Sequence, residues 1–169
     1  MEEAYLLLGS NLGDREKLLA EAIERIVLRC GKMEQMSSIY ESEPWGFSGN
    51  NDFLNQVIII NTKLPPQQLL SVILEIEQEL GRKRSKDKMV SRVIDIDILF
   101  LGQHVVDDHD LKIPHPSIQE RRFTLMPLLE ISPEKKHPVL KKTMRQLFNE
   151  CPDELKVASY FDRSLLPKY

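Results

Sequence analysis

Asp95 and Asp97 are the residues whose spacing most clearly suggests chemistry, since they interrupt an apolar run over 93–101. Alternate residues of a strand point to one face, so both carboxylates should emerge together, with Cα atoms about 6 to 7 Å apart. Such a pair can share one hard cation or bridge two, and Mg²⁺ prefers oxygen ligands of this kind. A solvated face of an amphipathic strand is the alternative. This alternation predicts that Leu99 and Leu101 lie on the same face as the aspartates. It predicts that four residues lie on the opposite face, toward the helices: Ile94, Ile96, Ile98 and Phe100.

A strongly basic segment, 82–92, immediately precedes this strand and carries six basic residues and one acidic residue. Paired carboxylates beside a basic segment suit a metal–polyphosphate substrate, because cations offset its charge and arginines bind phosphate oxygens bidentately. A solvated charge run is the alternative, and is the more frequent origin of such stretches. The position directly before the aspartates favours a binding site.

The turn at 9–13, Gly-Ser-Asn-Leu-Gly, separates an apolar run from a helical pattern. The N-terminus of a helix can bind an anion, so a phosphate site is one interpretation. The turn lacks the Gly-Lys-Ser/Thr ending of a P-loop, and a plain tight turn is therefore favoured.

Trp45, Phe47 and Phe53 lie around a glycine-containing loop, with Asn55 close by. Aromatic rings and an amide could sandwich and hydrogen-bond a flat heterocycle, although core or rim packing explains the rings equally well. His115 stands between two prolines, which hold its backbone extended. It is either a structural histidine or a phosphate contact.

The order of strand and helix patterns predicts an α+β fold of the ferredoxin-like βαββαβ type. An antiparallel sheet with both helices on one face would bury their apolar stripes. Asp14 is the expected N-cap of the first helix, and Gly31 its expected end. The expected strands span 4–8, 32–43, 53–62 and 93–101, and the expected helices span 14–31 and 65–81.

The chain beyond 102 reads as a C-terminal extension of the core. Two short apolar runs, 105–106 and 111–113, could pair as a hairpin, and short helices are expected within 116–131 and 143–150. We expect one domain over 1–169, with its core at about 1–102 and its extension at about 103–169.

The composition is that of an ordinary globular protein of 169 residues, with 41% apolar and 29% charged residues. The chain has 23 Lys and Arg residues against 26 Asp and Glu, a net charge of −3. This balance argues against a protein that binds nucleic acid or membrane through bulk positive charge. No apolar run approaches a membrane span, and the N-terminus does not resemble a signal peptide. Cys30 and Cys151 form neither a disulfide framework nor a zinc site, so we expect a cytoplasmic protein.

Taken in order, several segments resemble the 6-hydroxymethyl-7,8-dihydropterin pyrophosphokinase family of folate biosynthesis. Any one of them is modestly specific, whereas the ordered set is strongly so. The segments are G-S-N-L-G-D (9–14), S-x-Y-E-S-E-P-x-G (38–46), F-L-N (53–55), E-x-x-x-G-R-x-R (77–84), R-x-I-D-I-D-I-L (92–99), P-H-P (114–116) and R-x-F-x-L-x-P-L-x-E-I-x-P (121–133).

This resemblance implies transfer of the pyrophosphoryl group of ATP to the hydroxymethyl oxygen of 6-hydroxymethyl-7,8-dihydropterin, with release of AMP. It implies two Mg²⁺ ions held by Asp95 and Asp97, and a monomer whose partners are these small molecules rather than nucleic acid or membrane.

The resemblance also implies roles for individual residues. Ser42 stands where the family usually has a threonine near the pterin. The catalytic residues would be Arg82, Arg92, Asp95 and Asp97. The pterin contacts would be Ser42, Glu43, Trp45, Gly46, Phe53, Asn55 and Phe123. The contacts to ATP and its supporting network would be Glu77, Arg82, Arg84, Arg92, Ile98 (through its backbone), His115 and Arg121.

Two other classes of function compete with this interpretation. Ferredoxin-like sheets host many functions, so a non-catalytic small-molecule-binding or RNA-binding module is possible, although no paired aromatic stacking motif stands out in the strands. A metal-dependent nuclease or phosphatase could also use Asp95 and Asp97, although further ligands at a recognisable spacing are missing.

Overall fold

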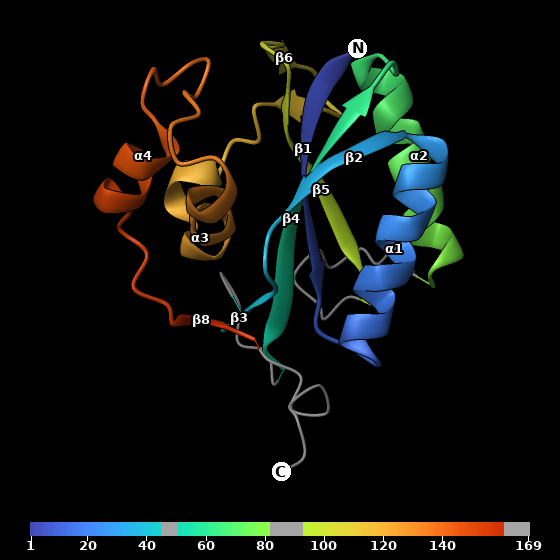
Figure 1. The fold of residues 1–169 in the computed structure, drawn as a ribbon, viewed down its shortest axis with the longest axis horizontal. Helices are drawn as coiled ribbons and strands as arrows, with labels where there is room; N and C mark the ends of the chain where they lie inside the picture. The colour runs from blue at the N-terminus through green and yellow to red at the C-terminus, as the bar shows by residue number, and fades with distance from the viewer. Residues whose placement is uncertain (45–50, 82–92, 161–169) are drawn as a thin grey trace.

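The computed structural model describes residues 1–44, 51–81 and 93–160, which form an antiparallel sheet between two layers of helices (Figure 1). The elements, in chain order, are β1 (Glu2–Ser10), α1 (Arg15–Arg29), β2 (Gly31–Met36), β3 (Tyr40–Ser42), β4 (Phe53–Thr62), α2 (Pro66–Glu79), β5 (Asp95–Leu101), β6 (Val106–Asp107), β7 (Lys112–Ile113), the 3₁₀ helix η1 (Ile118–Glu120), α3 (Arg122–Ile131), α4 (Met144–Glu150) and β8 (Val157–Ser159).

The sheet has the strand order β5-β1-β4-β3-β8, and β2 also pairs with β4. β1 lies antiparallel to both β4 and β5, and its pairing with β4 runs without a break from Glu2↔Thr62 to Ser10↔Leu54. The two strands at the centre of the core are therefore β1 and β4. They are the first and third of the four strands that the sequence predicted, as in a ferredoxin-like fold. The predicted βαββαβ topology and α+β class are confirmed. β6 and β7 form a separate two-stranded sheet.

The second strand pattern, expected over 32–43, is split into β2 and β3. Between them, the Ser37 backbone N–H donates to the Val57 carbonyl at 2.9 Å, and the Ser37 hydroxyl accepts the Val57 N–H at 3.0 Å. The outer edge of β3 pairs with β8, a strand that no sequence pattern predicted.

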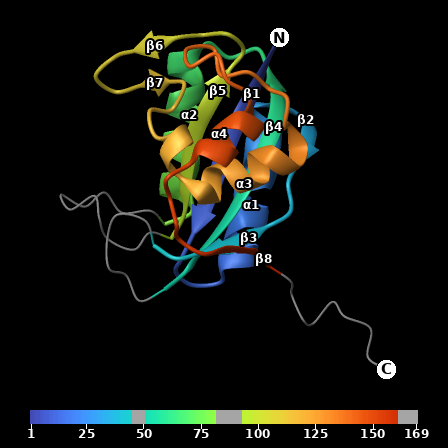
Figure 2. The ribbon, with the colours of Figure 1, turned by 90° about the vertical axis from the view of Figure 1, so that its left-hand side faces the viewer.

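Helices cover both faces of the sheet. α1 and α2 pack on one face, as expected, over a core that includes Leu6, Leu8, Ile58 and Ile60. The C-terminal helices α3 and α4 cover the opposite face, which the expectation of helices on one face did not include (Figures 1 and 2). The physical reason is that β1 and β4 carry apolar residues at consecutive positions, so both of their faces must be buried.

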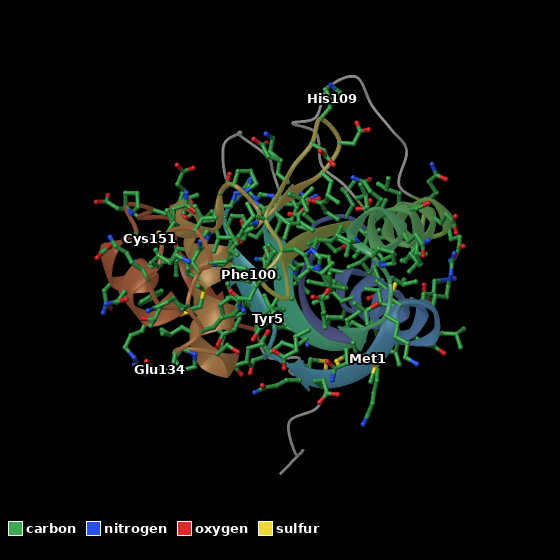
Figure 3. All side chains as sticks on the ribbon, turned by 90° about the horizontal axis from the view of Figure 1, so that it is seen from above. Met1, Tyr5, Phe100, His109, Glu134 and Cys151 are labelled. Carbon is green, nitrogen blue, oxygen red and sulfur yellow. The ribbon has the colours of Figure 1, made fainter. Side chains whose placement is uncertain are left out.

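The alternation of side chains along β5 is interrupted near its end. The register with β1 shifts between Leu6, paired with Ile98, and Tyr5, paired with Phe100. Phe100 therefore packs on the α3 side, where its ring meets Tyr5 edge-on at 5.6 Å between centroids (Figure 3), while Leu101 joins the α1/α2 core. The expected faces of Phe100 and Leu101 were wrong, because one extra residue reverses the alternation beyond it. Those of Ile94, Ile96, Ile98 and Leu99 were right.

Gly31 does not end α1 but begins β2, since the helix ends at Arg29 with Cys30 as its C-cap. A Cβ atom on Gly31 would lie 2.0 Å from the Asn61 carbonyl oxygen of β4. Glycine is required here by the close approach of two strands rather than by a left-handed backbone.

Replacing Gly31 by alanine is expected to destabilise the fold, because the added methyl group must displace β2 from the Asn61 carbonyl. Overpacking of this kind costs about 1–3 kcal/mol, which at this chain length lowers the Tm by about 3–10 °C. Thermal denaturation followed by circular dichroism measures the shift. Ser71→Ala, at an exposed position of α2, is the control. An unchanged Tm for Gly31→Ala would contradict the close approach.

The two cysteines and the lengths of the helices bear on the predictions made from composition. Cys30 is buried and Cys151 is partly buried, and both are free thiols. Burial raises the pKa of the Cys30 thiol to about 11. None of the helices within 1–44, 51–81 and 93–160 is both long and apolar enough to cross a membrane.

Candidate functional site

Asp95 and Asp97 lie at the start of β5, directly opposite Gly9 and Leu7 of β1. Gly9 is in turn paired with Asn55 of β4. Paired residues of neighbouring strands point to the same face, and Leu7 is buried in the core beneath α3 and α4. Both partly buried carboxylates therefore point to the α3 side, at the end of the sheet where β1 ends and β4 and β5 begin (Figure 1).

His115 faces this carboxylate pair. Its Nε2 atom lies 3.9 Å from Asp97 Oδ2, and its Nδ1 atom accepts the Ser117 backbone N–H at 3.1 Å. The pKa of His115 is lowered to about 4, chiefly by burial and also by the positive charge of Arg121, while Asp95 acts in the opposite direction. At neutral pH the imidazole is uncharged and carries its proton on Nε2, the nitrogen that faces Asp97.

Glu77 of α2 is buried and fixes the strand between the two aspartates. Its Oε2 atom accepts the Ile96 backbone N–H at 2.9 Å. That N–H therefore points away from β1, toward the outer edge of β5. Ile98, two residues along, turns its backbone polar groups to the same edge, while its side chain packs in the core.

Asn55 is buried, as is Ser42 of β3. Its Nδ2 atom donates to Ser42 Oγ at 2.8 Å and to the Tyr40 carbonyl at 3.4 Å. These bonds orient the amide with its nitrogen toward β3 and leave Oδ1 beside Gly9. Phe53, two residues earlier on β4, points to the same face. An oriented amide next to an aromatic ring is suited to reading the polar edge of a flat heterocycle.

The start of α3 brings a second aromatic ring to this face. Phe123 is partly buried against the core beneath α3, and the Arg121 guanidinium carbon lies 5.6 Å from the centroid of its ring. The positive charge of Arg121 is also one of the causes that lower the pKa of His115.

The remaining predicted residues are placed differently. Glu43 is exposed, and its Oε1 atom accepts the Lys156 N–H at 3.3 Å, so it connects the end of β3 to the segment before β8. Five predicted site residues lie outside the described residues: Trp45, Gly46, Arg82, Arg84 and Arg92.

Glu130 of α3 is a supporting residue that sequence reasoning missed. Its carboxylate accepts the Ser38 N–H, the Ser38 hydroxyl and the Tyr40 hydroxyl, the last at 2.6 Å. Burial alone would raise the pKa of Glu130, but these three hydrogen bonds hold it below its ordinary value. The contact fastens α3 to the strand that carries Ser42. No local pattern could predict it, because the partners are about 90 residues apart.

Arg15 at the start of α1 is a second missed contact. Its guanidinium donates to Glu41 Oε2 at 2.8 Å and to the Asp52 carbonyl at 2.9 Å. One side chain thus joins β3 to the residue preceding β4. These two strands carry Ser42 and Asn55, so the Arg15 contacts help to fix the distance between the two residues.

Only part of the expected turn at 9–13 lies outside a strand. Gly9 and Ser10 belong to β1, and Gly13 adopts a positive φ of 69°. The Asp14 side chain accepts the Lys17 N–H and so caps α1. A carboxylate at this helix N-terminus disfavours an anion there.

The two aspartates fit a magnesium site that is completed by substrate. No group of three or more His, Cys, Asp or Glu side chains in the described ranges could hold a metal ion by itself. Mg²⁺ is commonly bound by one or two carboxylates, with waters and substrate phosphates supplying the other oxygens. Asp95 and Asp97, partly exposed on one face, match that donor set.

Comparison with curated proteins gives relatives over most of the chain. A 2-amino-4-hydroxy-6-hydroxymethyldihydropteridine pyrophosphokinase of Aquifex aeolicus is 42% identical over 146 residues, which cover 86% of this chain and 90% of that protein. The folic acid synthesis protein fol1 of Pneumocystis carinii is 41% identical over 152 residues, or 90% of this chain but only 20% of its own length.

Solved structures share the fold. A crystal structure of wild-type Plasmodium falciparum HPPK-DHPS matches with a TM-score of 0.69 and 20% identity, over 88% of this chain and 44% of that one. An HPPK-DHPS in complex with substrates matches with a TM-score of 0.72 over 88% of this chain. This chain therefore spans less than half of the solved chains that it matches.

The sequence profile of one family covers the carboxylate pair, α3 and every strand of the main sheet except β8. It is the profile of 7,8-dihydro-6-hydroxymethylpterin-pyrophosphokinase, and it matches residues 5–133. With the site geometry and the relatives above 40% identity, this shows that the chain belongs to the 7,8-dihydro-6-hydroxymethylpterin-pyrophosphokinase family.

Proposed function

We propose that the reaction takes place on the row of paired residues that crosses the sheet from Asp95 through Gly9 to Asn55. The chain is a pyrophosphokinase of folate biosynthesis, which transfers the pyrophosphoryl group of ATP to the hydroxymethyl oxygen of 6-hydroxymethyl-7,8-dihydropterin. The observation that supports the location is this register, because it sets a carboxylate pair beside the amide of Asn55 and the ring of Phe53 on one face.

The nucleotide would lie along β5. Asp95 and Asp97 would hold two Mg²⁺ ions, which when bound offset the negative charge of the phosphates. The outward backbone of Ile98 would contact adenine. The uncharged His115 would donate from Nε2 to a phosphate oxygen. Arg121 would supply positive charge, and Glu77 would act by fixing β5. Arg82, Arg84 and Arg92 remain proposed phosphate contacts on the sequence resemblance.

The pterin would lie between Phe53 of β4 and Phe123 of α3, with the Asn55 amide reading its polar edge and Ser42 orienting that amide. Contacts from Trp45, Gly46 and Glu43 remain proposals on the resemblance. The substrate hydroxyl would attack the β-phosphorus in line, forming the new O–P bond as the bond to the AMP oxygen breaks. The hydroxyl proton is released, so the products are AMP and the pterin diphosphate. Positioning and charge stabilisation carry this reaction.

The covered sheet argues against the competing nucleic-acid module. An RNA-binding sheet of this topology stacks bases on its open face. Here α3 and α4 cover the face opposite α1 and α2 (Figure 2). Tyr5, Phe100 and their neighbours are buried beneath them. We further propose a cytoplasmic monomer, formed as a single domain over 1–169.

The proposal predicts that ATP, Mg²⁺ and 6-hydroxymethyl-7,8-dihydropterin together yield AMP. Nucleotides separated by ion-exchange chromatography measure the product, and omission of the pterin or of Mg²⁺ is the control. Formation of ADP, or no turnover, would contradict the reaction. Equal AMP formation without Mg²⁺ would contradict the metal role of the aspartates.

A further inference from the structure

Gly9 lies at the centre of the proposed site, between its two halves. It is paired with Asp95 on one side and with Asn55 on the other. Neighbouring strands are about 4.8 Å apart, so the backbones of Asp95 and Asn55 are separated by about 10 Å across Gly9. Any side chain at position 9 would rise between them on the same face.

The fold itself does not require glycine at this position. Of the five glycines in the described residues, Gly13, Gly81 and Gly102 have positive φ angles, and Gly31 has no room for a Cβ atom. Gly9 has neither constraint: its φ lies outside the left-handed region, and a Cβ atom would meet its nearest neighbours at 3.7 to 3.9 Å, an ordinary contact distance. Glycine in the interior of a strand normally weakens it. A glycine that costs stability without a structural reason calls for a functional one.

The atoms that a Cβ atom would meet indicate that function. The three nearest are Asn55 Oδ1 and Phe53 Cδ1, both at 3.7 Å, and the Leu54 carbonyl oxygen at 3.9 Å; no atom of Asp95 is among them. An added methyl group would therefore stand against the two side chains that face the pterin.

We propose that Gly9 is a specificity-determining residue that forms the floor of the pterin site. Its missing side chain leaves the space through which the hydroxymethyl arm of the substrate passes from the ring, held at Asn55 and Phe53, to the phosphates, held at Asp95. This inference rests on the proposed function, because that function assigns the ring to one side of Gly9 and the phosphates to the other.

Gly9→Ala separates this role from a structural one. We expect the pterin KM to rise about tenfold, since one methyl group in a closely fitted pocket is worth a factor of this order. Gly9→Val should raise it further. The dissociation constant of a non-hydrolysable ATP analogue with Mg²⁺, measured by calorimetry, should stay within about twofold for Gly9→Ala, and its Tm should be unchanged or higher.

The unchanged chain is assayed beside the variants. If it does not form AMP, the proposed function fails and takes this inference with it. If it does, and both Gly9 variants bind the pterin as it does, Gly9 is not the floor of the site. A lowered Tm for Gly9→Ala, like that expected for Gly31→Ala, would overturn the inference by making Gly9 a structural glycine. An equal loss of ATP-analogue affinity would also overturn it, because the methyl group would then not act on the pterin side alone.

Discussion

Changing Asp97 to asparagine is expected to reduce kcat by about a thousandfold or more, with the Tm within about 2 °C of the unchanged chain. Asparagine keeps the size of the side chain but removes the charge that would bind Mg²⁺. The fold should tolerate the change, because this side chain is partly exposed and does not belong to either hydrophobic core.

Steady-state kinetics at several Mg²⁺ concentrations measures this effect, together with thermal denaturation. The half-saturating Mg²⁺ concentration should rise along with the loss of rate. Asp110→Asn is the matched control, since that carboxylate is exposed and contacts His109 between β6 and β7, away from the row. Full activity of Asp97→Asn would mean that Asp95 and Asp97 are only solvated strand residues, the alternative left open by the sequence.

Changing Asn55 to leucine is expected to raise the KM for the pterin by about a hundredfold or more, because a polar substrate edge would lose its partner in a buried site. The variant removes the donor to Ser42 Oγ and the Tyr40 carbonyl as well as the amide oxygen beside Gly9. Affinity for an ATP analogue should change by about twofold or less, since Asn55 lies two strands away from Asp95.

Asn61→Leu provides a control on the same strand. Asn61 lies near the opposite end of β4, where its Nδ2 atom donates to Glu34 Oε1 at 2.6 Å. It should leave the pterin KM unchanged. Kinetics with each substrate varied in turn measures both variants. A pterin KM for Asn55→Leu close to that of Asn61→Leu would remove Asn55 from the site.

The core topology could be predicted because its signals are local and strong. The β-branched run in β4 and the apolar stripes of α1 and α2 repeat at the periods of a strand and of helices. The short elements with weak local signals were harder to predict. β8 is three residues long and exists through its pairing with β3, and no property of Val157–Ser159 alone indicates a strand.

The residues of the site likewise include some that local sequence predicts and some that it does not. Asp95 and Asp97 share a face because they are two residues apart on one strand, which is a local consequence of strand geometry. Beyond Leu99 the same argument failed, because the irregularity opposite β1 reversed the faces of Phe100 and Leu101. A bulge arises from how two strands pair, and one strand's own sequence carries little sign of it.

Local sequence therefore sufficed for most strands and both helices of the core and for the shared face of the carboxylate pair, and the resemblance of its motifs sufficed for the reaction. Only the tertiary structure brought Gly9 between Asp95 and Asn55, turned Glu77 onto the Ile96 amide and fastened α3 to β3 through Glu130. These contacts join residues far apart in the chain. They follow from strand register and from the burial of both faces of the sheet, which are properties of the packed chain as a whole.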